Sequence, residues 1–164
     1  GGSGTLAVAV RGEGAWQTEI ENSEKDFTSL QVSDVREPGQ ARLLRSVESG
    51  HTNIGKMDYL AEELAVEVDP VRMDSQAKYM LLAAGKGDLY LRFLSSKQPD
   101  YKERIWDQAA GSLIVEEAGG KVSDLHGRNL DFSAGRTLLH NRGLLASNGY
   151  LHSQALQALQ VIQA

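Results

Sequence analysis

Residues 104–120 read RIWDQAAGSLIVEEAGG, and this stretch combines an amphipathic helix with a signal that ends it. The glycine pair at 119–120 is typical of a helix end. Before it, apolar residues recur at helical spacing, at Ile105, Ala109, Leu113, Ile114 and Ala118. The sequence therefore predicts a helix over about residues 103–118, followed at once by a strand over residues 121–123.

Asp107 is a carboxylate in the first turns of this otherwise apolar helix. One turn further on stand Ala110 and Gly111, and neither can neutralise it. A buried carboxylate without a partner is costly, so it calls for a cation such as a divalent metal ion. The alternative is a first-turn aspartate that caps free N–H groups or pairs with Arg104. From these residues alone, both interpretations stay open.

Composition excludes several classes of protein. The chain has 164 residues, of which 41% are hydrophobic, and no stretch approaches the roughly 20 apolar residues of a membrane span. Seventeen Lys and Arg against 22 Asp and Glu give a net charge of −5. This charge disfavours nonspecific binding to nucleic acid or to an anionic membrane. We therefore expect one soluble unit without nucleic-acid or membrane partners, in which any phosphate is held locally.

The chain contains no cysteine, which excludes a disulfide framework, a thiolate nucleophile and a Cys-ligated zinc. Its four histidines show no metal-binding spacing, so a histidine-based zinc site is not expected. No signal peptide precedes the first predicted strand. These observations favour a reducing cytoplasm.

The N-terminal residues predict a hairpin. After Gly1–Gly4, a linker or a glycine loop, apolar residues alternate through Leu6, Val8 and Val10. Residues 12–14 form a turn, and residues 15–20 resume the extended pattern. A short strand is predicted over residues 30–33. So few strands cannot form a stable sheet alone, so they pair with strands outside this chain or lie at the edge of the same core.

The remainder of the chain alternates strands and helices, which is typical of an α/β fold with a layered sheet and flanking helices. We divide the chain into residues 1–33, the glycine-rich start and hairpin, and residues 34–164, an α/β domain. The predicted strands cover residues 41–47, 71–73, 89–93, 121–123 and 144–147, and the predicted helices cover residues 54–64, 75–84 and 103–118 and start again at residue 150.

Residues 74–79, DSQAKY, open one of these helices. Ser75 is predicted as its N-cap, and the free N–H groups behind it form an anion site. The helix dipole disfavours a cation in the first turn, so Lys78 indicates a bound anion that it helps to neutralise. The alternative is a capping serine with a solvated lysine.

Two further residues are candidate ligand contacts. Alternation along residues 89–93 places Arg92 beside Tyr90, near the C-terminal end of the strand. Ligands gather at that end of open α/β sheets, and arginine offers a planar fork for phosphate. His51 follows a glycine and precedes a helix, where it can donate to a ligand. The alternative for both is ordinary polar surface.

Taken together, the motifs resemble the C-terminal half of the 3'(2'),5'-bisphosphate nucleotidases, within the inositol monophosphatase-like superfamily of magnesium-dependent, lithium-sensitive phosphatases. The Trp-Asp motif is shared across the superfamily, whereas DSQAKY points to the nucleotidases. The resemblance covers nearly the whole chain and is carried by Gly50-His51 and by residues 74–79, 90–93, 104–111, 117–120 and 130–133.

The resemblance implies roles for these residues. It makes Asp107 a ligand to Mg2+, and Ser75, Lys78 and Arg92 contacts to the nucleotide and its non-scissile phosphate. His51 is similar to the family's histidine near the nucleotide, and Asp74 orients its neighbours. The implied reaction is hydrolysis of adenosine 3',5'-bisphosphate, a small-molecule substrate, to AMP and phosphate by a metal-activated water.

The chain departs from the family's pattern in one respect. The family's other metal ligands come from a Glu-Glu pair and an Asp-Pro-Ile-Asp-Gly-Thr motif in its N-terminal half. Here Glu62-Glu63 and Glu116-Glu117 lie in predicted helices, and Asp69-Pro70 continues as Val-Arg-Met. A single carboxylate holds magnesium poorly.

We therefore expect a chain that is inactive alone and whose partner is the N-terminal half of the same enzyme. By the same resemblance, residues 1–33 belong to an N-terminal antiparallel sheet. Two alternatives remain. The first is a stand-alone nucleotide-binding or regulatory module without catalysis. The second is a phosphatase for inositol bisphosphates, although residues 74–79 favour the nucleotide.

Overall fold

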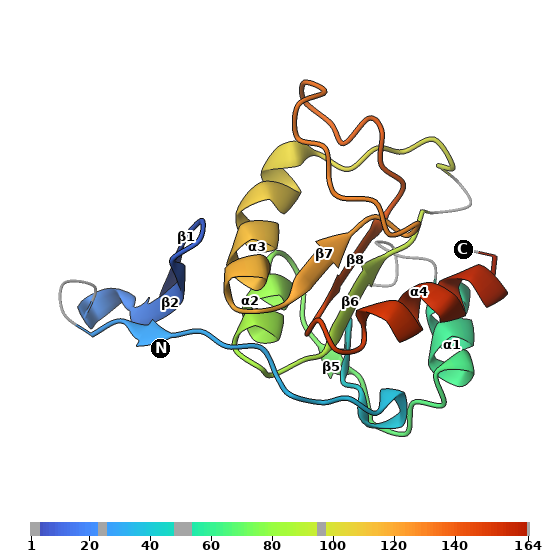
Figure 1. The fold of residues 1–164 in the computed structure, drawn as a ribbon, viewed down its shortest axis with the longest axis horizontal. Helices are drawn as coiled ribbons and strands as arrows, with labels where there is room; N and C mark the ends of the chain where they lie inside the picture. The colour runs from blue at the N-terminus through green and yellow to red at the C-terminus, as the bar shows by residue number, and fades with distance from the viewer. Residues whose placement is uncertain (1–3, 23–25, 48–53, 95–97, 164) are drawn as a thin grey trace.

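A computed structural model describes residues 4–22, 26–47, 54–94 and 98–163 of the chain, and these residues form four layers (Figure 1). A small antiparallel sheet lies on one side, followed by helices α2 and α3, a five-stranded sheet, and helices α1 and α4. The predicted α/β fold with flanking helices is confirmed.

The small sheet contains the predicted hairpin. Strands β1 (Thr5–Val10) and β2 (Gly14–Glu19) pair antiparallel, and β3 (Thr28–Ser29) pairs with the other side of β2. A 3-10 turn, Ile20–Asn22, follows β2. The hairpin turn needs glycine, because Gly12 and Gly14 have φ angles of 81° and 121°. Both glycine N–H groups donate to the carboxylate of Glu117, at 2.9 and 3.1 Å, which ties the turn to the end of α3.

The strand predicted over residues 30–33 is wrong, because the strand β3 ends at Ser29. Leu30 keeps one hydrogen bond to β2, from its N–H to the Ala15 carbonyl at 2.8 Å, and the residue is buried in the core, only 4% exposed. Val32 then donates its N–H to the carbonyl of Ala118 instead of to a strand. A second 3-10 turn, Pro38–Gln40, leads into the large sheet.

The large sheet has the strand order β5-β4-β6-β8-β7. Strand β4 runs parallel to β5 and to β6, whereas β8 runs antiparallel to β6 and to β7. The carboxyl ends of β4, β5 and β6 therefore meet at one edge, where ligands bind in such sheets. The five strands are β4 (Leu43–Arg45), β5 (Val71–Arg72), β6 (Leu89–Arg92), β7 (Lys121–Ser123) and β8 (Leu144–Ser147).

Alternate residues of the central strands supply two hydrophobic clusters, one on each face. Leu43, Leu89 and Leu91 pack against helices α1 (Ile54–Glu63) and α4 (His152–Val161). Leu44 and Tyr90 pack on the opposite face against α2 (Ala77–Ala83) and α3 (Ile105–Glu117). Because side chains alternate along β6, Arg92 lies on the same face as Tyr90, toward α2 and α3.

The small sheet shares the core of the second cluster. Ala15 and Leu30 are buried in it together with Tyr79 of α2 and Val115 of α3. The hairpin thus lies against the helices, in a layer separate from the large sheet, and the domain boundary at residue 33 stays a prediction.

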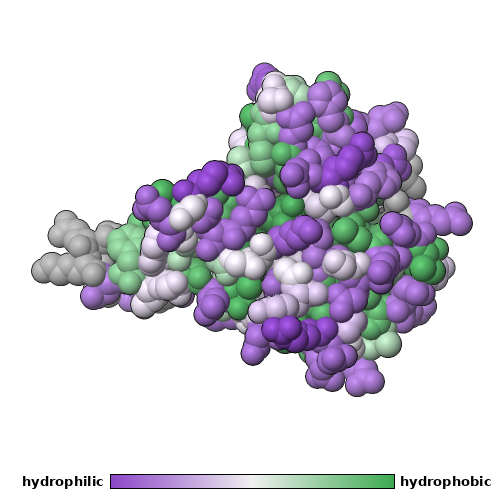
Figure 2. All heavy atoms as spheres, in the orientation of Figure 1, coloured by the Kyte–Doolittle hydropathy of each residue, from purple (hydrophilic) through white to green (hydrophobic). Residues whose placement is uncertain are grey.

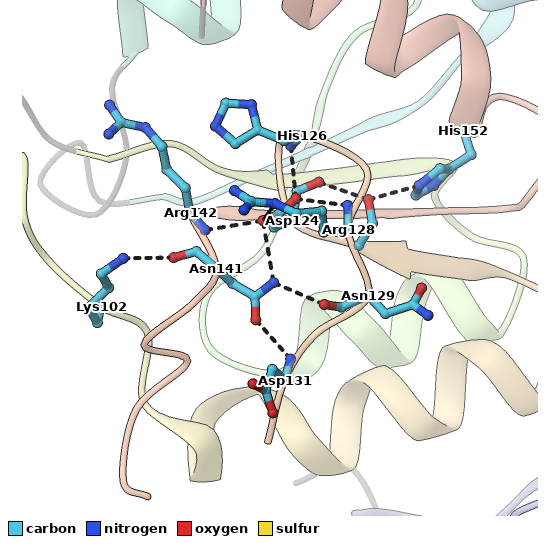
Figure 3. A network of polar contacts seen from close by, with 10 residues as sticks. Lys102, Asp124, His126, Arg128, Asn129, Asp131, Asn141, Arg142 and His152 are labelled. Carbon is cyan, nitrogen blue, oxygen red and sulfur yellow. Dashed lines mark hydrogen bonds and ion pairs between the residues drawn. The ribbon is translucent and has the colours of Figure 1, made fainter. Parts of the chain in front are cut away.

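A buried polar network centred on Asp124 organises the long loop between β7 and β8 (Figure 3). The Asp124 carboxylate is fully buried and accepts the N–H groups of His126 and Arg128, both at 2.9 Å. Asn141 donates to the same carboxylate and accepts the N–H of Asp131. These bonds replace the secondary structure that the loop lacks, since buried polar groups need partners.

Hydrophilic residues cover much of the face seen in Figure 2, with hydrophobic residues distributed among them. Across the described ranges, every helix is too short or too polar to cross a bilayer.

Candidate functional site

A pocket of about 600 Å³ opens where the parallel strands end. Ser46 follows β4, Asp74 follows β5, and Arg92 is the last residue of β6. Helices α2 and α3 supply the facing wall. The residues that line the pocket are Ser46, Asp74, Ser75, Gln76, Lys78, Tyr79, Tyr90, Arg92, Tyr101 and Asp107.

Four of the five residues singled out in the sequence thus share one cavity: Ser75, Lys78, Arg92 and Asp107. They come from three segments that are up to 32 positions apart in the chain. The fifth, His51, lies outside the described residues, so its place near a ligand stays a prediction.

Lys78 is a buried cation whose hydrogen-bond partners among the described residues are neutral. Its side chain is 4% exposed, and its Nζ donates to Ser46 Oγ at 3.0 Å and to the Met73 carbonyl at 3.2 Å. The ammonium lies 5.3 Å from the centre of the Tyr90 ring. Burial lowers the pKa of Lys78, and the Asp74 carboxylate opposes this shift. Within the described part of the chain it forms no ion pair, so a bound anion would satisfy it.

Arg92 is the second cation of the pocket. Its Nε donates to Glu103 Oε1 at 2.8 Å. Burial acts to lower the pKa of Arg92, but the adjacent Tyr90 and Glu103 outweigh it and raise the pKa above its ordinary value. The guanidinium therefore stays charged, as phosphate binding requires.

Behind Arg92 lies a buried chain of hydrogen bonds. Tyr79 Oη donates to Gln108 Oε1 at 2.5 Å, and Gln108 Nε2 donates to Glu103 Oε2 at 2.7 Å. Glu103, Gln108 and Tyr79 are 5%, 1% and 1% exposed. Burial raises the pKa of Tyr79 well above its ordinary value, which keeps its hydroxyl protonated as a donor. These hydrogen bonds connect α2, α3 and β6.

Asp107 lies in the first turn of α3 and is half-buried at the pocket wall. The carboxylate has no hydrogen bond or ion pair with any residue in the described ranges. Arg104, one of the two kinds of partner that the alternative interpretation offered, instead lies over the Trp106 ring, 5.9 Å from its centre. An oxygen donor left free at a pocket wall fits a hard cation such as Mg2+. The described residues nevertheless contain no cluster of three or more metal-ligating side chains.

The prediction that Ser75 caps α2 is wrong. The helix begins at Ala77 after Gln76, and no side chain caps it. Ser75 has a φ of 58°, in the left-handed region, and its hydroxyl accepts the Ala77 N–H only at 3.4 Å. Because the N-cap residue is Gln76 and makes no side-chain cap hydrogen bond, Ser75 does not hold the predicted N-cap position, and the anion site at this end of α2 stays a prediction. The burial of Lys78 is a separate indication of a bound anion.

Sequence reasoning missed Ser46, Gln76 and Tyr101 as pocket residues. Ser46 lies 32 residues before Lys78, which it contacts, so a local sequence pattern could not predict this contact. Gln76 donates to the Trp106 carbonyl at 3.3 Å, which ties the start of α2 to α3. The available signal was the position of Ser46 near the C-terminal end of the strand predicted over residues 41–47.

The profile of the Inositol monophosphatase family matches residues 3–164. The chain belongs to the inositol monophosphatase family.

Similar members of the family are bisphosphate nucleotidases, as the sequence motifs predicted. The 3'(2'),5'-bisphosphate nucleotidase of Schizosaccharomyces pombe is 40% identical over 159 residues, which are 97% of this chain and 44% of that protein. The protein of the same name from Emericella nidulans is 40% identical over 162 residues, 98% of this chain and 46% of that protein. The chain thus spans slightly under half the length of these curated relatives.

Solved structures support the fold. An inositol monophosphatase from Anabaena has a TM-score of 0.67 at 21% identity, covering 96% of this chain and 57% of that one. SuhB from Mycobacterium tuberculosis has a TM-score of 0.65 at 26% identity, covering 96% of this chain and 55% of that one. The inositol monophosphatase fold is therefore represented here over about half its length.

Proposed function

We propose that this chain is the part of a 3'(2'),5'-bisphosphate nucleotidase that binds the uncleaved phosphate of the substrate and supplies one ligand, Asp107, to magnesium. The observation that carries the proposal is the pocket itself. It places a buried lysine, Lys78, and a half-buried arginine, Arg92, beside a carboxylate that no described residue neutralises. The names of the relatives support the substrate class.

In this proposal Lys78 and Arg92 hold the 5'-phosphate of adenosine 3',5'-bisphosphate. Arg92 offers a planar fork held at its Nε by Glu103, and Lys78 offers a point charge held by two neutral oxygens. A charge-assisted hydrogen bond contributes about 1.5 to 3 kcal/mol, so two cations account for most of the selectivity for a second phosphate. Ser75 adds a hydroxyl at the pocket wall. His51 is proposed near the nucleotide on the sequence resemblance alone.

Asp107 would hold Mg2+ together with oxygen ligands from water, from the substrate and from residues outside this chain. The bound ion would supply charge stabilisation and an activated water for hydrolysis of the substrate to AMP and phosphate. The protein residues of the pocket bind and orient the nucleotide so that its 3'-phosphate lies toward Asp107. Because this chain offers one carboxylate, we propose that it is inactive until the N-terminal half of the enzyme, its partner, completes the ligand set.

The net charge of −5 supports a small-molecule substrate over nucleic acid. The absence of cysteine from the sequence supports a cytoplasmic location. The two alternatives, a non-catalytic nucleotide-binding module and an inositol bisphosphate phosphatase, differ from the proposal in ligand or in turnover.

The first test measures binding to the 164-residue chain by NMR titration, with adenosine 3',5'-bisphosphate, adenosine 3'-monophosphate and inositol 1,4-bisphosphate as ligands. We expect the nucleotide bisphosphate to bind most tightly and to shift the amide signals of residues around the pocket. Tighter binding of the inositol bisphosphate, or no binding of the nucleotide, would contradict the proposal.

The second test measures turnover in Mg2+, for the chain alone and after co-expression with the N-terminal half of the S. pombe relative. We expect release of phosphate only with both halves present. Turnover of about 1 to 1,000 per second by the chain alone, the range of ordinary enzymes, would contradict the half-site proposal. Binding without turnover by the combined halves would favour the non-catalytic module.

A further inference from the structure

We propose that Glu103 is a positioning residue that fixes the Arg92 guanidinium for phosphate binding. It forms the end of the buried hydrogen-bond chain Tyr79–Gln108–Glu103, and this role rests on the proposed function of the pocket. No motif in the sequence marks Glu103, and the residue lies behind the pocket wall.

The direction of every hydrogen bond in the chain is determined by chemistry. A carboxylate only accepts, so Glu103 takes a hydrogen bond from Arg92 Nε on one oxygen and from Gln108 Nε2 on the other. The Gln108 amide oxygen is then left to accept, and the protonated Tyr79 hydroxyl donates to it. Each buried polar group in the chain thereby has a partner, which makes the arrangement rigid.

Glu103 and Gln108 act on the ligand only through Arg92. They are 5% and 1% exposed, and neither lines the pocket that Arg92 and Lys78 share. A free arginine side chain would lose rotamer freedom when it binds phosphate. Holding its Nε in advance lowers that cost and leaves the end of the guanidinium for the ligand.

The hydrogen-bond chain also connects the proposed metal ligand, Asp107, with the proposed phosphate-binding residue, Arg92. Gln108 directly follows Asp107 in the first turns of α3. The helical turn that places the metal ligand therefore also carries the group that orients Glu103, and through it Arg92. A shift of α3 would move the metal ligand and the phosphate-binding arginine together.

Two substitutions at Glu103 separate positioning from charge. Glu103→Ala removes the acceptor and releases Arg92. Glu103→Gln removes the charge but can keep the geometry, because the whole chain can reverse: its amide oxygen accepts from Arg92, its NH2 donates to Gln108 Oε1, and Gln108 Nε2 donates to the Tyr79 hydroxyl. A positioning role therefore predicts that glutamine rescues what alanine loses.

The experiment uses the 164-residue chain and two readouts. The first is the NMR signal of the Arg92 Nε–H group in the free chain, which should persist in wild type and Glu103→Gln and collapse toward the exchanging arginine signals in Glu103→Ala. The second is the Kd of adenosine 3',5'-bisphosphate and of adenosine 3'-monophosphate. Glu103→Ala should raise the Kd of the bisphosphate about tenfold, equivalent to about 1.4 kcal/mol, and leave the Kd of the 3'-monophosphate unchanged.

The matched control is Glu117→Ala, which removes a carboxylate that also accepts two hydrogen bonds but lies at the hairpin turn. It should leave both readouts as in wild type. Equal losses for alanine and glutamine at position 103, or equal losses on both ligands, would overturn the positioning role. So would a Glu103→Ala effect that adds in full to Arg92→Ala, because residues acting in series are not additive.

If Glu103→Ala does not fold, Tyr79→Phe decides the question, with Tyr59→Phe on the exposed face of α1 as its control. Tyr79→Phe removes only the hydroxyl. It should broaden the Arg92 Nε–H signal and weaken binding of the bisphosphate more than binding of the 3'-monophosphate. Unchanged readouts would overturn the proposal. Failure of the proposed function gives a different result from failure of the positioning role. If the proposed function is wrong, the wild-type chain does not bind the bisphosphate, but the Arg92 Nε–H signal still changes in Glu103→Ala.

Discussion

Gly111 of α3 lies directly against the ring of Tyr79 of α2, and a Cβ placed on Gly111 would lie 2.3 Å from Tyr79 Cδ2. Glycine inside a helix costs about 1 kcal/mol relative to alanine, so the close approach of the two helices outweighs that cost. The approach also brings Gln108 within reach of the Tyr79 hydroxyl. The glycine of the WDQAAG motif thus has a packing role at the site.

Gly111→Ala should destabilise the chain by about 1 to 3 kcal/mol, because the added methyl group overlaps the buried Tyr79 ring, which must shift. It should also weaken binding of adenosine 3',5'-bisphosphate by displacing Tyr79 from Gln108. Urea unfolding and an NMR titration measure the two effects. The control is Gly55→Ala on the exposed side of α1, which should be neutral or stabilising. Unchanged stability of Gly111→Ala would mean that α2 and α3 are not packed this closely.

Asp107→Asn should leave the fold intact, with a change of no more than about 0.5 kcal/mol in unfolding free energy, because the carboxylate has no partner among the described residues. It should abolish local metal binding. Mn2+ as a paramagnetic probe should broaden amide signals near residue 107 in wild type and spare them in the variant. Asp131→Asn, on the loop between β7 and β8, is the control. Broadening that persists in Asp107→Asn, or marked destabilisation, would show that Asp107 is a structural residue.

His152 is a buried histidine whose two ring nitrogens each form a hydrogen bond with a serine. Ser123 Oγ donates to the Asp124 carbonyl at 2.8 Å, so it accepts from His152 Nε2 at 2.9 Å (Figure 3). Ser147 Oγ lies 2.8 Å from Nδ1 and therefore donates to it. Burial, with the charge of Lys121, lowers the pKa of His152 to about 4. Protonation would leave Nδ1 facing a hydroxyl that must turn away.

This arrangement makes stability depend on pH. The unfolded chain takes up a proton at His152 near pH 6.5, whereas the folded chain resists it down to about pH 4. The contribution is thus fully present above about pH 6.5 and is lost as the pH falls from there to about 4, with an upper value of roughly 3 kcal/mol. Urea unfolding between pH 7.5 and 4.5 should show this slope in wild type and in His126→Ala, and a flatter one in His152→Gln. Equal slopes in all three would refute the assignment to His152.

Most of the fold could be predicted because each element carries a strong local signal. Alternation in β1 and β6 and helical periodicity in α1 and α3 were sufficient. The short strand β3 was misplaced because Leu30 reads as a strand residue whichever partner it buries against. Ser75 was misjudged because its backbone is left-handed, with a φ of 58°, and the helix begins two residues later, at Ala77; the sequence pattern shows neither.

The sequence indicated several residues of the site, but it did not show that they lie together in one pocket. Lys78, Arg92 and Asp107 were each ambiguous alone, and only the packing of α2 and α3 on β6 brings them to one pocket. Glu103 and Gln108 could not be found at all, because a buried hydrogen bond between segments depends on side-chain geometry.

In the proposed function, Lys78 and Arg92 bind the phosphate that is not cleaved. The most direct test compares the Kd values of adenosine 3',5'-bisphosphate and adenosine 3'-monophosphate for the wild-type chain, Lys78→Ala and Arg92→Ala. We expect each variant to weaken the bisphosphate about tenfold or more, since each removes a charge-assisted hydrogen bond of about 1.5 to 3 kcal/mol, with little change for the 3'-monophosphate. An equal loss on both ligands, or no loss on either, would contradict the account.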